Sequence, residues 1–180
     1  MKSTVKTQNF TTQIIVTEFT FLMSAVLMMA ALSRVTIPLI PIPVTGQTLG
    51  VLLTGIMLGR KRAVAALITY IVMGLIGFPV FANGTFGLST LMGPTGGYLL
   101  GFIPAAFIMG WLGEKGWYNG IFSSLAAILI GHLVIFTFGL IWLGHFSAWT
   151  NVFAAGLLPF LPGAVIKTFV AFALIPIIRK

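Results

Sequence analysis

The sequence predicts an all-α membrane protein with six transmembrane helices in a single domain, residues 1–180. Hydrophobic residues make up 58% of the chain and charged residues 7%, and the mean hydropathy of +1.11 is far too high for a soluble domain. The apolar segments follow one another closely, and most basic residues lie at their ends. We therefore assign the net charge of +8 to membrane orientation and expect no nucleic-acid partner.

The six spans are expected at about residues 14–32, 47–59, 63–78, 95–112, 121–143 and 152–178. The first has about the 20 residues that a hydrocarbon core requires, and no small-residue cleavage site follows it, so we expect a retained span rather than a signal peptide. The basic run at residues 60–62 separates the second span from the third, and the polar run at 113–116 ends the fourth. The fifth is apolar for more than 20 residues, and the sixth is broken at residues 159–162 because proline removes helical hydrogen bonds.

Three irregular segments connect or interrupt these spans. Residues 33–46 contain three prolines and cannot form a regular helix, residues 79–94 open a run rich in Gly, Ser and Thr, and residues 159–162 form the break in the last span. Non-helical backbone at membrane depth is tolerated only where protein or a water-filled cavity satisfies its polar groups. With six spans all three segments lie on the same side, which predicts a pocket there.

The basic residues orient the chain in the membrane. Six spans put both termini on one side, and that side carries Lys2, Lys6, Arg60, Lys61, Arg62, Lys115, Arg179 and Lys180. Of the ten basic residues, only Arg34 falls in a loop on the other side, and Lys167 lies within a span. Because basic residues concentrate on the inner side, we expect cytoplasmic termini, an outward-facing pocket and a multi-pass protein of the cell membrane.

Lys167 is the strongest single candidate for a functional residue. A lysine at the centre of a span costs about 2.5–3.5 kcal/mol on insertion scales, so it indicates a binding site by default. It lies about one turn after the helix start that Pro162 implies, and free N–H groups beside a lysine suit an anion. The alternative is that Lys167 reaches back to the outer interface and binds nothing.

The other polar residues indicate neither catalysis nor a metal site. Arg34 is more typical of a headgroup anchor than of a ligand contact, and His132 is either a proton relay or an interhelical hydrogen-bonding residue. Two histidines, two acids and no cysteine offer no spacing suited to a metal, and no nucleophile has a plausible base. We therefore expect a protein without enzymatic activity or cofactor.

Three motifs carry a resemblance to a known family. They are PIPVTGQTLGVLLTG at 41–55, GFPVFANGTFGLSTLMGPTGGYLLGF at 77–102 and LPFLPGAVIK at 158–167. Together they resemble the BioY family, the biotin-capturing S components of energy-coupling-factor (ECF) transporters. The resemblance implies the ECF S-component fold, biotin capture at the outer face, and assembly in the bilayer with a transmembrane coupling protein and two ATP-binding-cassette (ABC) ATPases.

The resemblance also implies site residues. By motif position, Asn83 is expected to bond the ureido ring of biotin, and Lys167 with its helix start to hold the polar end of the site. Further lining positions are Gln47, Gly93, Pro94, Thr95 and Tyr98. Phe78, Phe81 and Phe86 are candidate apolar walls near Asn83.

The chain departs from the family pattern in two places. Ala164 stands where the last motif of the family usually has an acid, so a partner for the ligand and for Lys167 is missing. We therefore expect an affinity roughly ten- to a hundredfold below that of an acid-containing relative. The first span also lacks the expected Ala-xxx-Ala spacing for the coupling protein, since its small residues are Ser24, Ala25, Ala30 and Ala31.

Two other functions remain open from the sequence. An S component for another vitamin would keep the fold and change the ligand. A membrane assembly subunit that binds no small molecule would show no stabilisation by any ligand.

Overall fold

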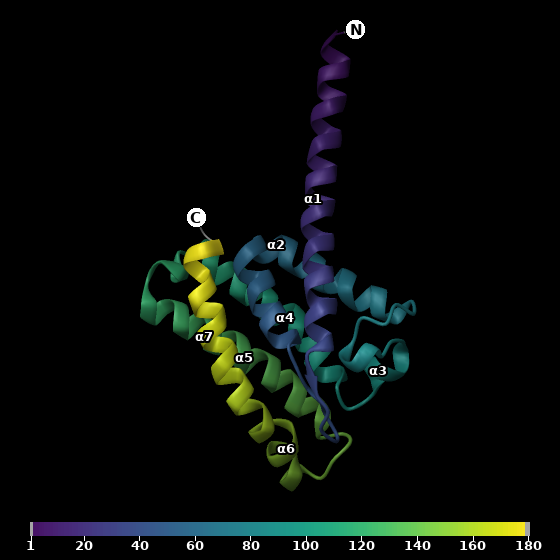
Figure 1. Cartoon of the computed structure of the whole chain (residues 1–180), viewed down its shortest axis with the longest axis vertical. Coiled ribbons are helices and arrows are strands. Elements are labelled where there is room, and N and C mark those ends of the chain that lie inside the picture. The colour runs from purple at the N-terminus through teal and green to yellow at the C-terminus, as the bar shows by residue number, and fades with distance from the viewer. Residues whose placement is uncertain (1, 179–180) are drawn as a thin grey trace.

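A computed structural model describes residues 2–178 of the chain, with side chains described for residue 13 and residues 15–178. The chain is mostly helical (Figure 1). Its elements are α1 (Lys2–Arg34), β1 (Thr36–Ile37), β2 (Val44–Thr45), α2 (Gln47–Leu75), η1 (Ala82–Gly84), α3 (Leu88–Met92), α4 (Gly96–Glu114), η2 (Trp117–Asn119), α5 (Ile121–Leu143), α6 (Trp149–Gly156), η3 (Leu158–Phe160) and α7 (Leu161–Ile178). The two short strands pair antiparallel, with Thr36 opposite Thr45.

The first helix is longer than the predicted span 14–32. It runs from Lys2 to Arg34, because residues 2–13 contain no proline or glycine that would end it. The apolar part, Ile15–Arg34, is long enough to cross a membrane. The boundary drawn from hydropathy therefore marks where the helix becomes apolar, and the helix itself starts earlier.

The predicted second and third spans form one bent helix, α2. The bend lies at Gly59, whose φ of 70° is a left-handed conformation that favours glycine. The break predicted at residues 60–62 lies one residue earlier, because these three residues are helical and begin the second half of α2. Four segments of the described chain are long and apolar enough to cross a membrane. The halves of α2 are not among them, because each is shorter than the roughly 20 residues of a straight span.

Glu114, at the end of α4, fastens the bend. Its Oε1 accepts a hydrogen bond of 3.0 Å from the backbone N–H of Arg60, and its Oε2 lies 3.0 Å from Nε of the same arginine. The first N–H groups of a helix have no partner within the helix, so this carboxylate caps the second half of α2 from a distant part of the chain.

We expect Glu114→Ala to lower the free energy of unfolding by about 1 kcal/mol, because it removes this cap. The thermal unfolding midpoint of the detergent-purified protein measures the change. Glu114→Gln keeps an acceptor oxygen and is the matched control, with a smaller loss. Equal midpoints for wild type and Glu114→Ala would show that the bend does not depend on the cap.

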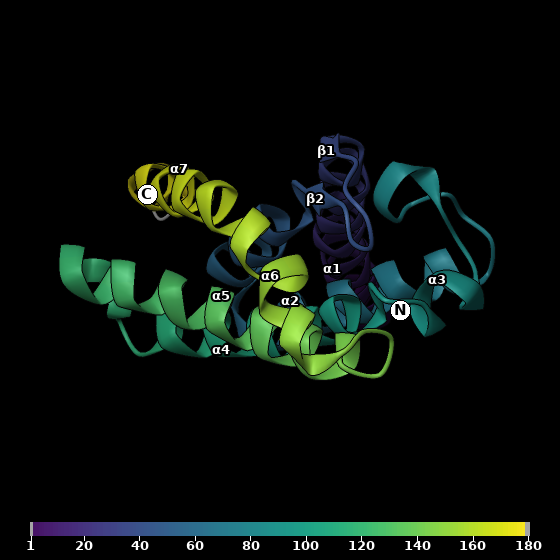
Figure 2. The ribbon, with the colours of Figure 1, turned by 90° about the horizontal axis from the view of Figure 1, so that it is seen from below.

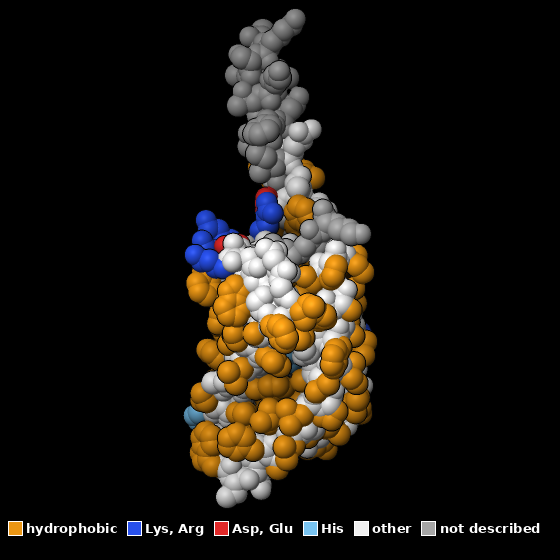
Figure 3. All heavy atoms as spheres, turned by 90° about the vertical axis from the view of Figure 1, so that its left-hand side faces the viewer, with side chains coloured by type: hydrophobic (Ala, Val, Ile, Leu, Met, Phe, Trp, Pro, Cys, Tyr) orange, Lys and Arg blue, Asp and Glu red, His pale blue; other side chains and the backbone are white. Residues whose placement is uncertain are grey.

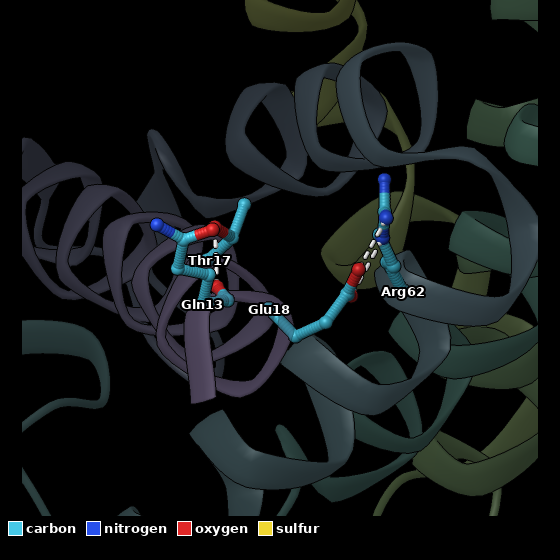
Figure 4. Close-up of polar contacts among 4 residues, drawn as sticks. All are labelled: Gln13, Thr17, Glu18 and Arg62. Carbon is cyan, nitrogen blue, oxygen red and sulfur yellow. Dashed lines mark hydrogen bonds and ion pairs between the residues drawn. The ribbon is translucent and has the colours of Figure 1, made fainter. Parts of the chain in front are cut away.

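A second ion pair joins α1 to α2 close to the bend. Arg62 donates from Nε to Oε2 of Glu18 at 2.7 Å and from Nη2 to Oε1 (Figure 4). Its guanidinium also lies 5.4 Å from the centre of the Phe21 ring. In the same view Thr17 donates to the carbonyl of Gln13 within α1. Both acids of the chain are therefore paired with arginines of α2.

Helices α2, α4 and α5 form the centre of the bundle and approach one another closely at glycines. At Gly55 of α2 a Cβ would lie 3.1 Å from the carbonyl oxygen of Ala106 in α4, and at Gly101 of α4 it would lie 3.3 Å from that of Ile135 in α5. Gly55 and Gly101 thus mark close helix contacts, where a small residue lets two backbones approach. This packing gives the pocket rigid walls.

Large apolar side chains cover the outside of the bundle, and the Lys and Arg side chains visible in Figure 3 gather near one end. Leu133 on α5 and Phe169 on α7 keep 65% and 63% of their surface exposed. Lipid chains suit such a surface. The β-ribbon, α3 and α6 lie toward the end of the body opposite the C-terminus and the bend of α2 (Figures 1 and 2).

Candidate ligand-binding pocket

The three irregular segments come together around one pocket at this loop end. The hollow, its open mouth included, has an empty volume of about 500 Å³. Its polar lining residues are Thr45, Gln47, Thr48, Thr90, Thr95 and Lys167. Its apolar lining residues are Ile42, Pro43, Phe81, Ala82, Tyr98, Leu99, Phe102, Phe136 and Phe160, with Tyr98 adding a hydroxyl. Apolar walls with a few convergent polar groups are the usual design of a ligand site.

Lys167 supplies the cation of the pocket. It is half-buried on α7, and its Nζ donates to the carbonyl of Thr45 at 2.5 Å and to Oγ1 of Thr48 at 2.7 Å. An ammonium has three donors, so one remains for a ligand. Both acids of the chain are paired near the bend of α2, so the charge of Lys167 has no carboxylate side chain as a partner in the described structure. Lys167 does not extend to the outer interface, as the alternative interpretation required. Its ammonium faces the pocket and binds the β2–α2 junction.

A buried hydrogen-bond network holds the β2–α2 junction against the loop after α2. Gln47 donates from Nε2 to the Tyr70 hydroxyl at 2.5 Å, and Tyr70 donates in turn to the carbonyl of Val80 at 2.7 Å. Thr45 donates to Oε1 of Gln47 at 2.9 Å. The Gln47 amide is thus bonded at both ends within the protein, and its place in the pocket is fixed before a ligand arrives.

We expect Tyr70→Phe to lower the free energy of unfolding by about 2 kcal/mol. The Tyr70 side chain is fully buried, and the substitution removes its hydroxyl group. The Gln47 N–H then lacks its acceptor and the Val80 carbonyl lacks its donor. Thermal unfolding in detergent checks this, with Tyr118→Phe as a control that removes another buried hydroxyl far from the pocket. A specific role in the pocket requires that ligand affinity falls in Tyr70→Phe and not in Tyr118→Phe.

Aromatic rings form one wall. The rings of Tyr98 and Phe160 are stacked with centres 5.7 Å apart, and Phe136 meets Phe160 edge-on at 6.0 Å. The Tyr98 hydroxyl donates to the carbonyl of Gly156 at 2.7 Å, which ties the end of α6 to α4. These contacts join α4, α5 and the break before α7 into one surface.

The eight predicted site residues divide into two groups. Gln47, Thr95, Tyr98 and Lys167 line the pocket, whereas Asn83, Gly93, Pro94 and Ala164 are not among its lining residues. Asn83 is exposed with a φ of 55°, directly after the lining residue Ala82, and the carbonyl of Gly93 accepts a hydrogen bond from Trp142 at 2.9 Å. Ala164 is half-buried and lies one turn before Lys167.

Further pocket residues have no sequence signal of their own. Thr45 and Thr48 lie on either side of Gln47 in the first of the three motifs. Their place in that motif is the only sequence feature that indicates a role in the pocket. Phe136 and Phe160 look like ordinary apolar residues of a span. Of the three predicted walls, Phe81 lines the pocket, while Phe78 and Phe86 are exposed. Arg34 is exposed and donates from Nη2 to the carbonyl of Pro79 at 2.5 Å, so it binds the loop that carries Phe81. Its role as a headgroup anchor stays a prediction.

Comparison with known sequences agrees with this architecture. The sequence profile of the BioY family matches residues 1–180. The chain belongs to the BioY family. Relatives include the biotin transporter BioY of Thermotoga maritima, 39% identical over 76% of this chain and 80% of the relative, and BioY2 of Lactococcus lactis, 37% identical over 77% and 76%. BioY of Rhizobium etli is 35% identical over 78% of this chain and 79% of its own length.

A solved structure shares the fold of this BioY-family chain. It is the S-component for biotin from an ECF-type ABC transporter, with a TM-score of 0.81, 25% identity and 93% of each chain covered. The predicted ECF S-component fold is thereby confirmed, while the number of spans and the orientation of the termini are predictions.

Proposed function

We propose that this chain is the biotin-binding S component of an ECF-type transporter. It captures biotin at the outer face of the cell membrane and delivers it inward together with a transmembrane coupling protein and two ABC ATPases. It is a transport subunit and not an enzyme. The observation that carries the proposal is the aromatic pocket with a lysine that no carboxylate side chain of the described structure neutralises, in a chain of the BioY family.

Biotin matches this pocket chemically. Its bicyclic ring and valeryl chain are apolar and suit the wall of Tyr98, Phe136 and Phe160. Its ureido group and carboxylate need a few directed hydrogen bonds, for which Lys167 has a free donor. The hydroxyls of Thr90 and Thr95 donate to backbone carbonyls, so their oxygens remain as acceptors for a ligand N–H. Asn83 is proposed as a contact at the rim, beside Ala82.

A titration of the purified protein with biotin tests the proposal. The chain has four tryptophans, and Trp142 is bonded to Gly93 close to the pocket-lining Thr95, so fluorescence and calorimetry both report on binding. We expect saturable binding of biotin and none of thiamine or riboflavin. Tight binding of another vitamin would identify an S component of different specificity. A folded protein that binds no vitamin would support the assembly subunit.

The proposed topology has its own test. The chain has no cysteine, so single cysteines introduced at Asn83 and at Lys115 report on the two sides of the membrane. A membrane-impermeant maleimide added to intact cells should label Asn83→Cys and not Lys115→Cys. The reverse pattern would place the pocket on the cytoplasmic side and contradict outward capture.

A further inference from the structure

His132 is a buried polar side chain that the pocket described above does not use. It lies in the middle of α5 with 5% of its surface exposed. Its Nδ1 lies 3.2 Å from the carbonyl oxygen of Ile128, and because a carbonyl only accepts, Nδ1 carries the hydrogen. In the neutral ring Nε2 is then an acceptor. Within the described residues this atom has no hydrogen-bond partner.

The imidazole lies directly behind the aromatic wall. Its ring is stacked on Phe136 with centres 6.2 Å apart and an angle of 29°, and Phe136 lines the pocket and packs against Phe160. Lys167 lies on α7, which packs against α5. His132 is not itself among the lining residues, so a ligand reaches Nε2 only when the Phe136 side chain turns aside.

The described lining of the pocket includes no carboxylate that could act as a strong acceptor. Glu18 and Glu114, the two acids of the chain, are bound to Arg62 and Arg60 near the bend of α2. A ureido ring presents N–H donors on either side of a carbonyl, and leaving such a donor unpaired on burial is costly. A carboxylate brings only acceptors and would face the Nε2 lone pair unfavourably. The pair of His132 and Lys167 thus suits a ureido group.

We propose that Nε2 of His132 accepts a hydrogen bond from a ureido N–H of biotin, while Lys167 donates to the ureido carbonyl. The proposal rests on the proposed function. It places the ureido ring at the inner end of the pocket and leaves the carboxylate toward the rim near Asn83. This orientation differs from the expectation that Asn83 bonds the ureido ring.

Substitutions at position 132 give the first test, by calorimetry with biotin. His132→Leu is expected to lower affinity about tenfold, and His132→Gln to recover most of it, because the Gln amide oxygen can take the place of Nε2. Thr54→Val is the matched control. Thr54 carries the other buried oxygen without a partner among the described residues, but it lines a separate groove beside α1. Its replacement should leave affinity unchanged. Wild-type affinity in a folded His132→Leu protein would overturn the proposal.

Nitrogen NMR of ¹⁵N-histidine-labelled protein gives a readout that a purely structural role would not change. The chain has two histidines, and the exposed His145 serves as an internal reference. Saturation with biotin should shift the His132 Nε2 resonance upfield, as acceptance of a hydrogen bond requires, and leave His145 in place. Biotin binding with an unchanged His132 signal would refute the contact. Absence of biotin binding by the wild type would refute both this inference and the proposed function.

Discussion

Replacing Lys167 with methionine is expected to lower the affinity for biotin about a hundredfold while the protein stays folded. Methionine keeps the apolar stem and removes the only cation among the described residues that line the pocket. A hydrogen bond from a charged donor contributes about 1.5–3 kcal/mol, and the upper part of that range corresponds to a hundredfold change in affinity. The loss of the bonds to Thr45 and Thr48 is offset in part, because a buried charge without a carboxylate partner also disappears.

Calorimetry with biotin and thermal unfolding without it measure the two effects separately. Lys115→Met is the matched control, since Lys115 is an exposed lysine in the polar turn after α4. Its substitution should change neither quantity. If Lys167→Met bound biotin as tightly as the wild type, the ammonium would serve only to hold the β2–α2 junction, and the ligand would have to find its donor elsewhere.

The sequence predicts the position of the pocket because three segments cannot form regular helix within the membrane. The prolines in residues 33–46 and the break at 159–162 forbid regular helix, and a polar loop at 79–94 is unfavourable in lipid unless it faces a cavity. The structure brings these three segments together around one space. Lys167 stood out for a related reason, because a charge within an apolar span is costly without a purpose.

The partners across the pocket were not predictable in the same way. Tyr70 lies in an apolar helix like any packing residue, and its role is visible only when Gln47 and Val80 meet it. The basic residues 60–62 predict a break between the second and third spans, whereas Gly59 and the distant Glu114 produce the bend that α2 has there. The orientation of the Asn83 side chain depends on a left-handed backbone conformation, which cannot be predicted from the position of Asn83 in the sequence.

Ala164→Asp is expected to raise the affinity for biotin ten- to a hundredfold. Residues three apart on a helix lie on one face, so a carboxylate at 164 is within reach of Lys167 and of a ligand beside it. A ligand N–H that donates to a charged acceptor contributes about 1.5–3 kcal/mol. Calorimetry of wild type, Ala164→Asp and the uncharged control Ala164→Asn separates the effect of the charge from that of side-chain size. Equal affinities for all three would show that position 164 does not reach the ligand, in keeping with its absence from the pocket lining.

The same substitution also bears on His132, because a ureido N–H that is bonded to the introduced carboxylate no longer needs the imidazole. His132→Leu should then cost about tenfold in the wild-type background and little in the Ala164→Asp background. Such a loss of additivity would mean that the two positions supply the same acceptor in different ways. Additive effects would place them at different ligand atoms. In that case the introduced carboxylate would act mainly through Lys167, and combining Ala164→Asp with Lys167→Met should abolish its gain.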